Sequence, residues 1–528
     1  MPTDVHKPQF NVAAPFYRQS RIRPEALALA VGEARLSYGE LASLASGISR
    51  QLTSSTASPR KIGILASRSI EAYAGVLGAL WSGAAYVPIN PKTPEERLLR
   101  ILEITRLDAL IVDAAGAKCL SARVLEHAPR LILAGSIPPG LFETAEGAGI
   151  TAADFLVSSE TPEEPAPVGE EALAYIIFTS GTSGAPKGVM VGSGSVAHLL
   201  NAMQTRYECG PEDRVSLAFD LTFDPSVLDM FMAWGSGASL HVVPDSQLMA
   251  PAKFIRDRRL TRWNSVPSIV AFMQRMGMLA PATFPQLRFS LFGGEPLPLA
   301  SAQAWQAAAP NSIVENLYGP TEATVACTVQ RVTDPPNVTP SRGIIAIGTP
   351  FGDTRAAVVD SSLNPVPQGT PGELMLAGRQ LALGYCGDPE LTAARFPMIR
   401  GRRWYRTGDL VYQETAGILH HLGRIDNQVK ILGNRVELEE VEAHLRAILG
   451  NDLVAAVAWP VKDGSAAGLI AFHCGSSVSP QEAREAMQKR VPAYMVPGQF
   501  RVIETMPLGA NGKIDRKALL VRLGEECD

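Results

Sequence analysis

The residues best suited to chemistry in this chain form a loop of Gly, Ser and Thr within residues 175–189. The apolar run at 174–178 predicts a buried strand that leads into this loop. Glycines let the backbone turn tightly, and its N–H groups can form an anion-binding nest, beside which Lys187 places a positive charge. The loop is not a Walker A motif, because no Gly-Lys-Ser/Thr sequence closes it and Pro186 precedes the lysine. We therefore predict a polyphosphate site, with a plain flexible turn as the alternative.

Further polar residues follow other predicted strands, where α/β enzymes place their ligand contacts. The Asp224 carboxylate could hold a substrate ammonium group or cap a helix, since Pro225 comes next. After a later strand, Tyr318 could stack on a purine, and Glu322 could help to hold Mg²⁺ beside phosphate. The recurrence of such residues at strand ends predicts a shared nucleotide site.

Apolar patterns predict the elements that position these residues. Strands are expected at residues 61–66, 108–112, 131–134, 174–178, 214–219, 287–292, 313–317, 453–459 and 469–473, and helices at 70–81, 95–104, 189–203 and 479–490. Because strands and helices alternate, we expect an α/β fold with layered, mostly parallel sheets and flanking helices. At 528 residues, the chain should hold more than one domain.

The composition excludes several classes of protein. Hydrophobic residues make up 46% and charged residues 19%, which is ordinary for a globular protein. The net charge of −4 argues against nucleic acid or an anionic membrane as a general partner. Six cysteines without a CxxC pair indicate reduced thiols, and no segment resembles a signal peptide or a membrane span. We expect a cytoplasmic protein.

Ten segments together carry a resemblance to a known family. They occur in the family's order, at residues 36–41, 81–91, 175–188, 223–226, 316–322, 372–385, 405–410, 423–442, 492–497 and 511–519. The chain resembles the adenylate-forming superfamily, and most closely the adenylation domains of nonribosomal peptide synthetases. The resemblance implies a large N-terminal domain at residues 1–425 and a small, mobile α+β domain at 426–528, with the hinge at Asp426.

The resemblance also implies a two-step reaction that uses ATP and Mg²⁺. A carboxylate first joins ATP to give an acyl-AMP and pyrophosphate. A phosphopantetheine thiol then attacks the adenylate to give a thioester and AMP. Because a carboxylate is a poor nucleophile and the α-phosphate is anionic, the enzyme must align them and neutralise the developing charge.

By resemblance, particular residues take these roles. The catalytic residues would be Thr321, Glu322, Lys430 and Lys513. Glu322 would hold the metal, and Lys513 would reach the reacting carboxylate and the α-phosphate. Rotation of the small domain would then withdraw Lys513 and present the region around Gly433 to the thiol. The ATP-binding residues would be Thr179, Ser180, Gly181, Thr182, Ser183, Lys187, Gly294, Glu295, Asn316, Leu317, Tyr318, Gly319, Thr321, Asp409 and Arg424.

The amino-acid pocket implied by the resemblance combines one carboxylate with a small or apolar lining. Its residues would be Asp224, Pro225, Leu228, Asn264, Leu291, Gly293, Leu317, Val325 and Ala326. Asp224 favours an amino acid, because a buried carboxylate without a cation is costly. No further charge is present, which disfavours charged side chains. We expect a small neutral L-amino acid such as Gly, Ala, Cys or Thr, with proline and nonproteinogenic residues also open.

Three alternatives share the fold: a D-alanine–carrier protein ligase, an acyl- or aryl-CoA ligase, and a non-catalytic nucleotide-binding scaffold. No carrier segment follows the last motif and no condensation domain precedes the first. We therefore expect a free-standing, monomeric enzyme that charges a separate acyl or peptidyl carrier protein in nonribosomal peptide, antibiotic or related natural-product biosynthesis.

The chain departs from the family pattern just before the hinge. It reads Ala416-Gly417, where the family usually has Asp-Gly. His420 and His421 are adjacent, so their side chains should point to opposite faces of a strand. We interpret both histidines as structural residues and not as metal ligands.

Overall fold

The computed structural model describes residues 9–55, 58–135, 137, 138, 140–154, 161–181, 185–340, 342–462, 465–475, 478–508 and 514–525. Two groups of predicted site residues lie outside this part of the chain. They are Thr182 and Ser183 of the phosphate loop, together with Lys513.

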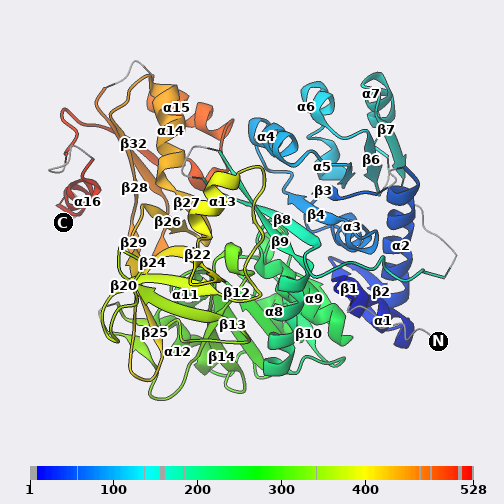
Figure 1. The fold of residues 1–528 in the computed structure, drawn as a ribbon, viewed down its shortest axis with the longest axis horizontal. Coiled ribbons are helices and arrows are strands. Elements are labelled where there is room, and N and C mark those ends of the chain that lie inside the picture. The colour runs from blue at the N-terminus through cyan, green and yellow to red at the C-terminus, as the bar shows by residue number, and fades with distance from the viewer. Residues whose placement is uncertain are drawn as a thin grey trace.

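An eight-stranded sheet forms one layer of the large domain (Figure 1). Its strands lie in the order β21 (Gly384–Tyr385), β9 (Lys187–Gly192), β8 (Leu173–Thr179), β4 (Ala85–Ile89), β3 (Lys61–Leu65), β5 (Ala109–Val112), β6 (Leu131–Ala134) and β7 (Thr151–Asp154). The strands from β8 to β7 are parallel, and β9 and β21 join antiparallel.

A nine-stranded sheet forms a second layer. Its order is β18 (Thr349–Pro350), β15 (Thr328–Arg331), β14 (Ile313–Tyr318), β13 (Phe289–Gly293), β12 (Arg262–Ser265), β10 (Arg214–Leu217), β11 (Ser239–Val242), β1 (Leu27–Val31) and β2 (Ala34–Ser37). The strands from β14 to β1 are parallel, whereas the edge strands are antiparallel. The prediction of layered, mostly parallel sheets is therefore confirmed.

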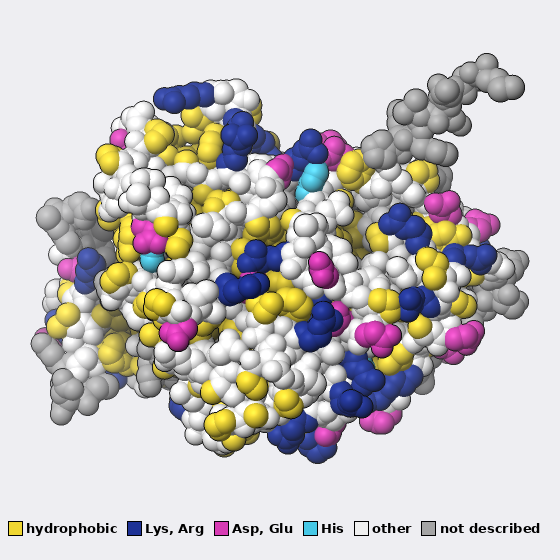
Figure 2. Space-filling view, turned by 90° about the horizontal axis from the view of Figure 1, so that it is seen from below, with side chains coloured by type: hydrophobic (Ala, Val, Ile, Leu, Met, Phe, Trp, Pro, Cys, Tyr) yellow, Lys and Arg dark blue, Asp and Glu magenta, His cyan; other side chains and the backbone are white. Residues whose placement is uncertain are grey.

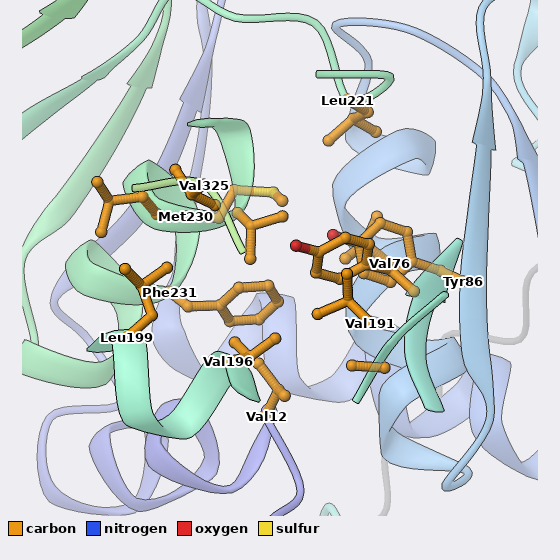
Figure 3. Close-up of a cluster of buried hydrophobic side chains, with 14 of the residues drawn as sticks. Val12, Val76, Tyr86, Val191, Val196, Leu199, Leu221, Met230, Phe231 and Val325 are labelled. Atoms are coloured by element: carbon orange, nitrogen blue, oxygen red, sulfur yellow. The ribbon is translucent and has the colours of Figure 1, made fainter. Parts of the chain in front are cut away.

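Helices cover both sheets. They are α1 (Ala14–Ile22), α2 (Tyr38–Ser55), α3 (Ile70–Trp81), α4 (Glu95–Thr105), α5 (Ala114–Ala117), α6 (Ala122–His127), α7 (Leu141–Gly147), α8 (Ser193–Tyr207), α9 (Pro225–Ser236), α10 (Ala252–Asp257), α11 (Pro267–Arg275), α12 (Leu299–Ala308) and α13 (Pro389–Arg395). The largest core joins the two layers through α8 and α9. Figure 3 shows Phe231 of α9 between Val196 of α8 and Val325, with Tyr86 of β4 on the opposite side of the cluster.

A third sheet precedes the C-terminal domain in the chain. It contains β19 (Arg355–Val359), β20 (Gly372–Ala377), β24 (Tyr405–Gln413) and β25 (Leu419–Arg424). Short strands β16 (Val338–Thr339) and β17 (Ile344–Ile345) pair separately, as do β22 (Met398–Ile399) and β23 (Arg402–Arg403).

The small C-terminal domain has two sheets and its own hydrophobic clusters. One sheet has the order β27 (Asn434–Glu437), β26 (Gln428–Ile431), β30 (Ser465–Ala466), β29 (Val461–Lys462), and the other β28 (Val454–Ala458), β31 (Leu469–His473), β32 (Gln499–Val502). Its helices are α14 (Leu438–Leu449), α15 (Pro480–Gln488) and α16 (Arg516–Glu525). The predicted boundary at residues 425/426 falls between β25 and β26, and stays a prediction.

The helix predicted at residues 189–203 is wrong in its first turn. Residues 187–192 form β9, which pairs antiparallel with β8, and α8 begins only at Ser193. Val189 and Val191 are buried in the sheet, and β-branched residues suit a strand packed in this way. The phosphate loop therefore connects the two strands of a hairpin.

Charged side chains of both signs are scattered among apolar ones on the face seen in Figure 2. That distribution agrees with the small net charge of the chain. Among the described residues, no helix combines the length and the apolar character needed to cross a membrane.

Candidate active site

A cavity of about 820 Å³ lies where the large domain meets the hairpin of β26 and β27. The end of β8 contributes Thr179, and β14 with its following turn contributes residues 316–321. The small domain contributes Lys430 and Arg435. The predicted ATP-binding residues in the wall are Thr179, Ser180, Gly294, Glu295, Asn316, Leu317, Tyr318, Gly319, Thr321, Asp409 and Arg424.

The buried carboxylate of Asp409 anchors one end of the cavity. Its Oδ1 accepts a hydrogen bond from Arg424 Nη1 at 2.8 Å, and its Oδ2 accepts one from the Tyr318 hydroxyl at 2.5 Å. Burial opposes the charged form, but Arg424 and then His421 hold the pKa of Asp409 well below its usual range. Asp409 is therefore an ionised acceptor, which suits the hydroxyl groups of a ribose.

Asn316 leaves a buried acceptor at the same end. Its amide nitrogen donates to the carbonyl of Ala346 at 2.9 Å. Its Oδ1 is buried and has no hydrogen-bond partner among the described residues. Since a buried polar atom without a partner is costly, this oxygen suits the amino group of a base.

The predicted phosphate loop begins where β8 ends. Thr179 pairs with Lys187 across the β8–β9 hairpin. A Cβ atom on Gly181 would lie 2.0 Å from the carbonyl oxygen of Ala185, so this position requires glycine. The hydroxyl of Thr179 is buried and has no partner among the described residues. These groups are suited to an anion that approaches the backbone closely.

Carboxylates of the small domain engage this loop. Glu437 Oε1 lies 3.2 Å from Lys187 Nζ, and Glu440 Oε2 accepts a hydrogen bond from the Gly181 backbone N–H at 2.8 Å. The other oxygen of Glu440 pairs with Arg97 of α4 at 2.8 Å; Arg97, Glu437 and Glu440 are buried, and the Lys187 side chain is 9% exposed. In this arrangement, protein carboxylates bind Lys187 and the Gly181 N–H, which could otherwise bind phosphate.

Glu322 is fully buried beside the loop and fits the role of a metal ligand. Burial would raise its pKa, but Arg435 and Lys187 override that effect and set it at about 2. Arg435 Nη1 lies 2.8 Å from one oxygen, and the Tyr385 hydroxyl donates to the other at 2.8 Å. An ionised carboxylate beside a phosphate site suits Mg²⁺, which is usually held by one or two carboxylates and by phosphates.

Asp224 also lies in the cavity wall and is 9% exposed. It occupies the N-cap position of α9, but its side chain makes no capping hydrogen bond. Its Oδ2 instead accepts from the Val325 backbone N–H at 3.2 Å, and Thr321 is a second hydrogen-bonding neighbour. Burial raises the pKa of Asp224 to about 6, although the charge of Lys430 opposes the shift. This carboxyl group therefore needs a cation to be stable in its ionised form.

The cavity wall contains only part of the predicted amino-acid pocket. Of the nine predicted pocket residues, only Asp224, Pro225, Leu317 and Val325 belong to the cavity wall. Asn264 lies behind the wall, where its amide nitrogen donates to Asp229 Oδ1 at 3.1 Å. The remaining residues outside the wall are Leu228, Leu291, Gly293 and Ala326. The Asn264 amide, which was expected to line the pocket, thus hydrogen-bonds to the buried carboxyl group of Asp229 on α9.

Lys430 projects into the same cavity from β26. Burial and repulsion from Arg435 lower its pKa to about 8, while Asp409 and Asp224 partly offset that shift. The second predicted catalytic lysine, Lys513, lies outside the described residues. Lys430 is thus a small-domain lysine in the same cavity wall as Asp224 and Asp409.

Sequence reasoning missed the contacts that join the domains. Arg435, Glu437 and Glu440 fall within the motif at residues 423–442, but no role was assigned to them. Lys187 and Glu437 are separated by 250 positions, so no local spacing could pair them. One signal in the sequence was the acidic run after Gly433, because its carboxylates could pair with the positive charge of the predicted phosphate loop.

Replacing Glu437 by Gln should slow thioester formation about a hundredfold or more, because breaking a buried pair costs about 3 kcal/mol or more. Adenylate formation should stay within about twofold, since Glu437 is given no part in that step. Carrier loading from a preformed adenylate and ATP–pyrophosphate exchange measure the two steps. Glu439→Gln is the matched control, because Glu439 pairs with Asn427 inside the small domain. Equal loss of both steps would contradict a function of the Glu437–Lys187 pair in the second step alone.

Comparisons with known proteins identify the family of this chain. The chain matches the model of the AMP-binding enzyme family over residues 16–386. Tyrocidine synthase 3 of Brevibacillus parabrevis is 34% identical over 513 residues, which are 96% of this chain and 8% of that synthase. The Vibrio cholerae adenylation domain AlmE, solved with glycyl-adenosine-5′-phosphate, is 31% identical with a TM-score of 0.90, over 99% of this chain and 100% of that one. PA1221, an NRPS protein with adenylation and PCP domains, is 25% identical with a TM-score of 0.78, over 98% of this chain and 84% of that one.

The chain belongs to the AMP-binding enzyme family of adenylate-forming ligases. Within it, the chain is an adenylation domain of the nonribosomal peptide synthetase type. It spans only a small part of the length of the synthases that it matches.

Proposed function

We propose that this protein activates a small neutral L-amino acid, with glycine the foremost candidate, and passes it to the phosphopantetheine thiol of a carrier protein. The observation that carries the proposal is the buried Asp224 carboxyl in the wall of a nucleotide cavity. A substrate ammonium group would supply the cation that this carboxyl needs. A wall that holds only four of the nine predicted pocket residues favours a short side chain, and the similar AlmE domain was solved with a glycyl adenylate.

The residues divide the first step among them. Asp224 holds the ammonium group, which places the substrate carboxylate beside Thr321. Tyr318, Asn316 and Asp409 hold the nucleoside, while Lys187 and the Gly181 backbone receive the phosphates. Mg²⁺, held by Glu322, would neutralise charge on the phosphates. Positioning and charge neutralisation together account for most of what such a transfer needs.

The small domain supports the second step. Glu437 pairs with Lys187 in this domain arrangement, so a triphosphate would compete with this carboxylate for the lysine charge. After pyrophosphate leaves, Glu437 and Glu440 can take its contacts and Arg435 can neutralise Glu322. The cavity then holds the adenylate for attack by a thiol. PA1221, which contains both adenylation and PCP domains, supports a carrier protein as the acceptor.

Amino-acid-dependent ATP–pyrophosphate exchange tests the proposal. The panel should contain the proteinogenic L-amino acids, D-alanine, and several fatty and aryl acids. We expect glycine, or one amino acid close to it in size, to give the strongest exchange. Exchange with D-alanine alone would indicate a D-alanine–carrier protein ligase. Exchange only with fatty or aryl acids would refute the ammonium role of Asp224.

A further inference from the structure

Two adjacent histidines of β25 have different surroundings. His420 stacks on Tyr412 with ring centroids 4.6 Å apart, and its Nδ1 lies 3.3 Å from the hydroxyl of Thr339. His421 faces the cavity, where its Nε2 lies 3.3 Å from Asp409 Oδ1. The interpretation of both histidines as structural residues therefore does not account for the position of His421 in the cavity wall.

Arg342 determines which nitrogen of His421 carries the proton. Its Nη1 lies 2.9 Å from His421 Nδ1 and also donates to the backbone carbonyl of His421 at 3.3 Å. A guanidinium group can only donate, so Nδ1 must accept and Nε2 must carry the hydrogen. The imidazole therefore donates from Nε2 to Asp409.

Arg342 itself has no carboxylate partner within ion-pair distance among the described residues. It lines the same cavity as His421 and Asp409. Its guanidinium group is partly desolvated by burial, which lowers its pKa. The nearest groups that it contacts are those of His421, so its effect on the site passes through the imidazole.

Asp409 consequently receives three donors. Arg424 and His421 both approach Oδ1, and the Tyr318 hydroxyl approaches Oδ2. A carboxylate has about four lone-pair positions, so about one remains, on Oδ2. With Oδ1 held from two sides, the carboxylate cannot rotate freely, and the remaining acceptor has a fixed direction.

We propose that His421, held in one tautomer by Arg342, is a nucleotide-positioning residue that orients Asp409 towards the ribose hydroxyls. This inference rests on the nucleotide role proposed for Asp409, and it does not depend on which acid is activated. The imidazole donor fixes the direction of the Asp409 acceptor before the nucleotide binds. The ordering cost of binding the ribose is therefore smaller, and the affinity is higher.

Calorimetric titration of the full chain with AMP and with 2′,3′-dideoxy-AMP tests the proposal. His421→Phe should weaken AMP binding about tenfold, because a hydrogen bond to a charged group is lost. The affinity for dideoxy-AMP should stay within about twofold, since that ligand has no ribose hydroxyls for Asp409. A general disturbance of the fold would weaken both ligands equally.

Further variants sharpen the test. His421→Gln keeps a donor near Nε2 and should restore most of the AMP affinity. Arg342→Met should reproduce part of the loss and Arg342→Lys should not. His420→Gln, one position away and facing Tyr412, is the control and should bind AMP as the wild type does.

The outcomes separate this inference from the proposed function. If the wild-type protein binds AMP but shows no pyrophosphate exchange with any amino acid, the proposed substrate class is wrong. The AMP titrations would still test the role of His421. Equal losses for AMP and dideoxy-AMP in His421→Phe, or no loss in either, would overturn the inference. A wild type that binds both nucleotides equally would overturn it too, because Asp409 would then not recognise ribose.

Discussion

Asp224→Asn should lower kcat/KM for amino-acid-dependent pyrophosphate exchange by about 10²- to 10³-fold. The physical reason is the burial of the carboxylate, which is 9% exposed in a mostly apolar wall. Removing one partner of a buried ion pair costs about 3–5 kcal/mol, because the other charge is left without compensation. The loss should appear mainly in KM for the amino acid. AMP affinity should not change, since Asp224 is assigned no contact with the nucleoside.

Asp229→Asn is the matched control for this variant. Asp229 is a buried carboxyl on the same helix, lies outside the cavity wall, and has a pKa raised by burial. Its neutral isostere should therefore keep exchange within about threefold. Wild-type kcat/KM should fall as pH drops below about 6, because Asp224 then becomes protonated, and Asp224→Asn should lose this dependence. Normal exchange by Asp224→Asn would remove the basis for an amino-acid substrate.

Lys513→Ala and Lys430→Ala should separate the two half-reactions. Lys513→Ala should lower pyrophosphate exchange about 10²- to 10³-fold, as expected when one charge-stabilising group is removed from a transition state. Lys430→Ala should leave exchange within about fivefold but slow transfer to a thiol by a similar 10² factor or more. The structure supports the second part, because Lys430 lies in the cavity in the arrangement in which Glu437 occupies Lys187.

Single-turnover measurements distinguish these effects. Adenylate formation is followed by pyrophosphate release, and transfer by loading of a carrier protein from a preformed adenylate. Lys517→Ala is the control, since Lys517 is an exposed residue of α16. Both variants should still bind ATP. If the two lysine variants lost the same step, the assignment of one lysine to each half-reaction would be wrong.

Local patterns in the sequence predicted much of the fold. Helix α3 and strands β6 and β31 have the predicted bounds, because each is set by a short apolar pattern with clear ends. The error at residues 189–203 has a tertiary cause. Pairing with β8 extends the hairpin through Gly192, and the helix starts only where that pairing stops. A local pattern of Gly and Val does not show which partner strand is available.

By itself, the sequence determined the chemical class of the site. Glycines, hydroxyls and Lys187 predict a phosphate loop wherever the chain places it, and the placing of Asp224, Tyr318 and Glu322 at strand ends predicts a shared site. Only the tertiary structure determined which partners the polar groups of the site contact. It directed Asn264 to Asp229, His421 to Asp409 and Glu437 to Lys187. The reason is physical: such contacts depend on how sheets and domains pack, and residues far apart in the chain carry no shared period that would reveal them.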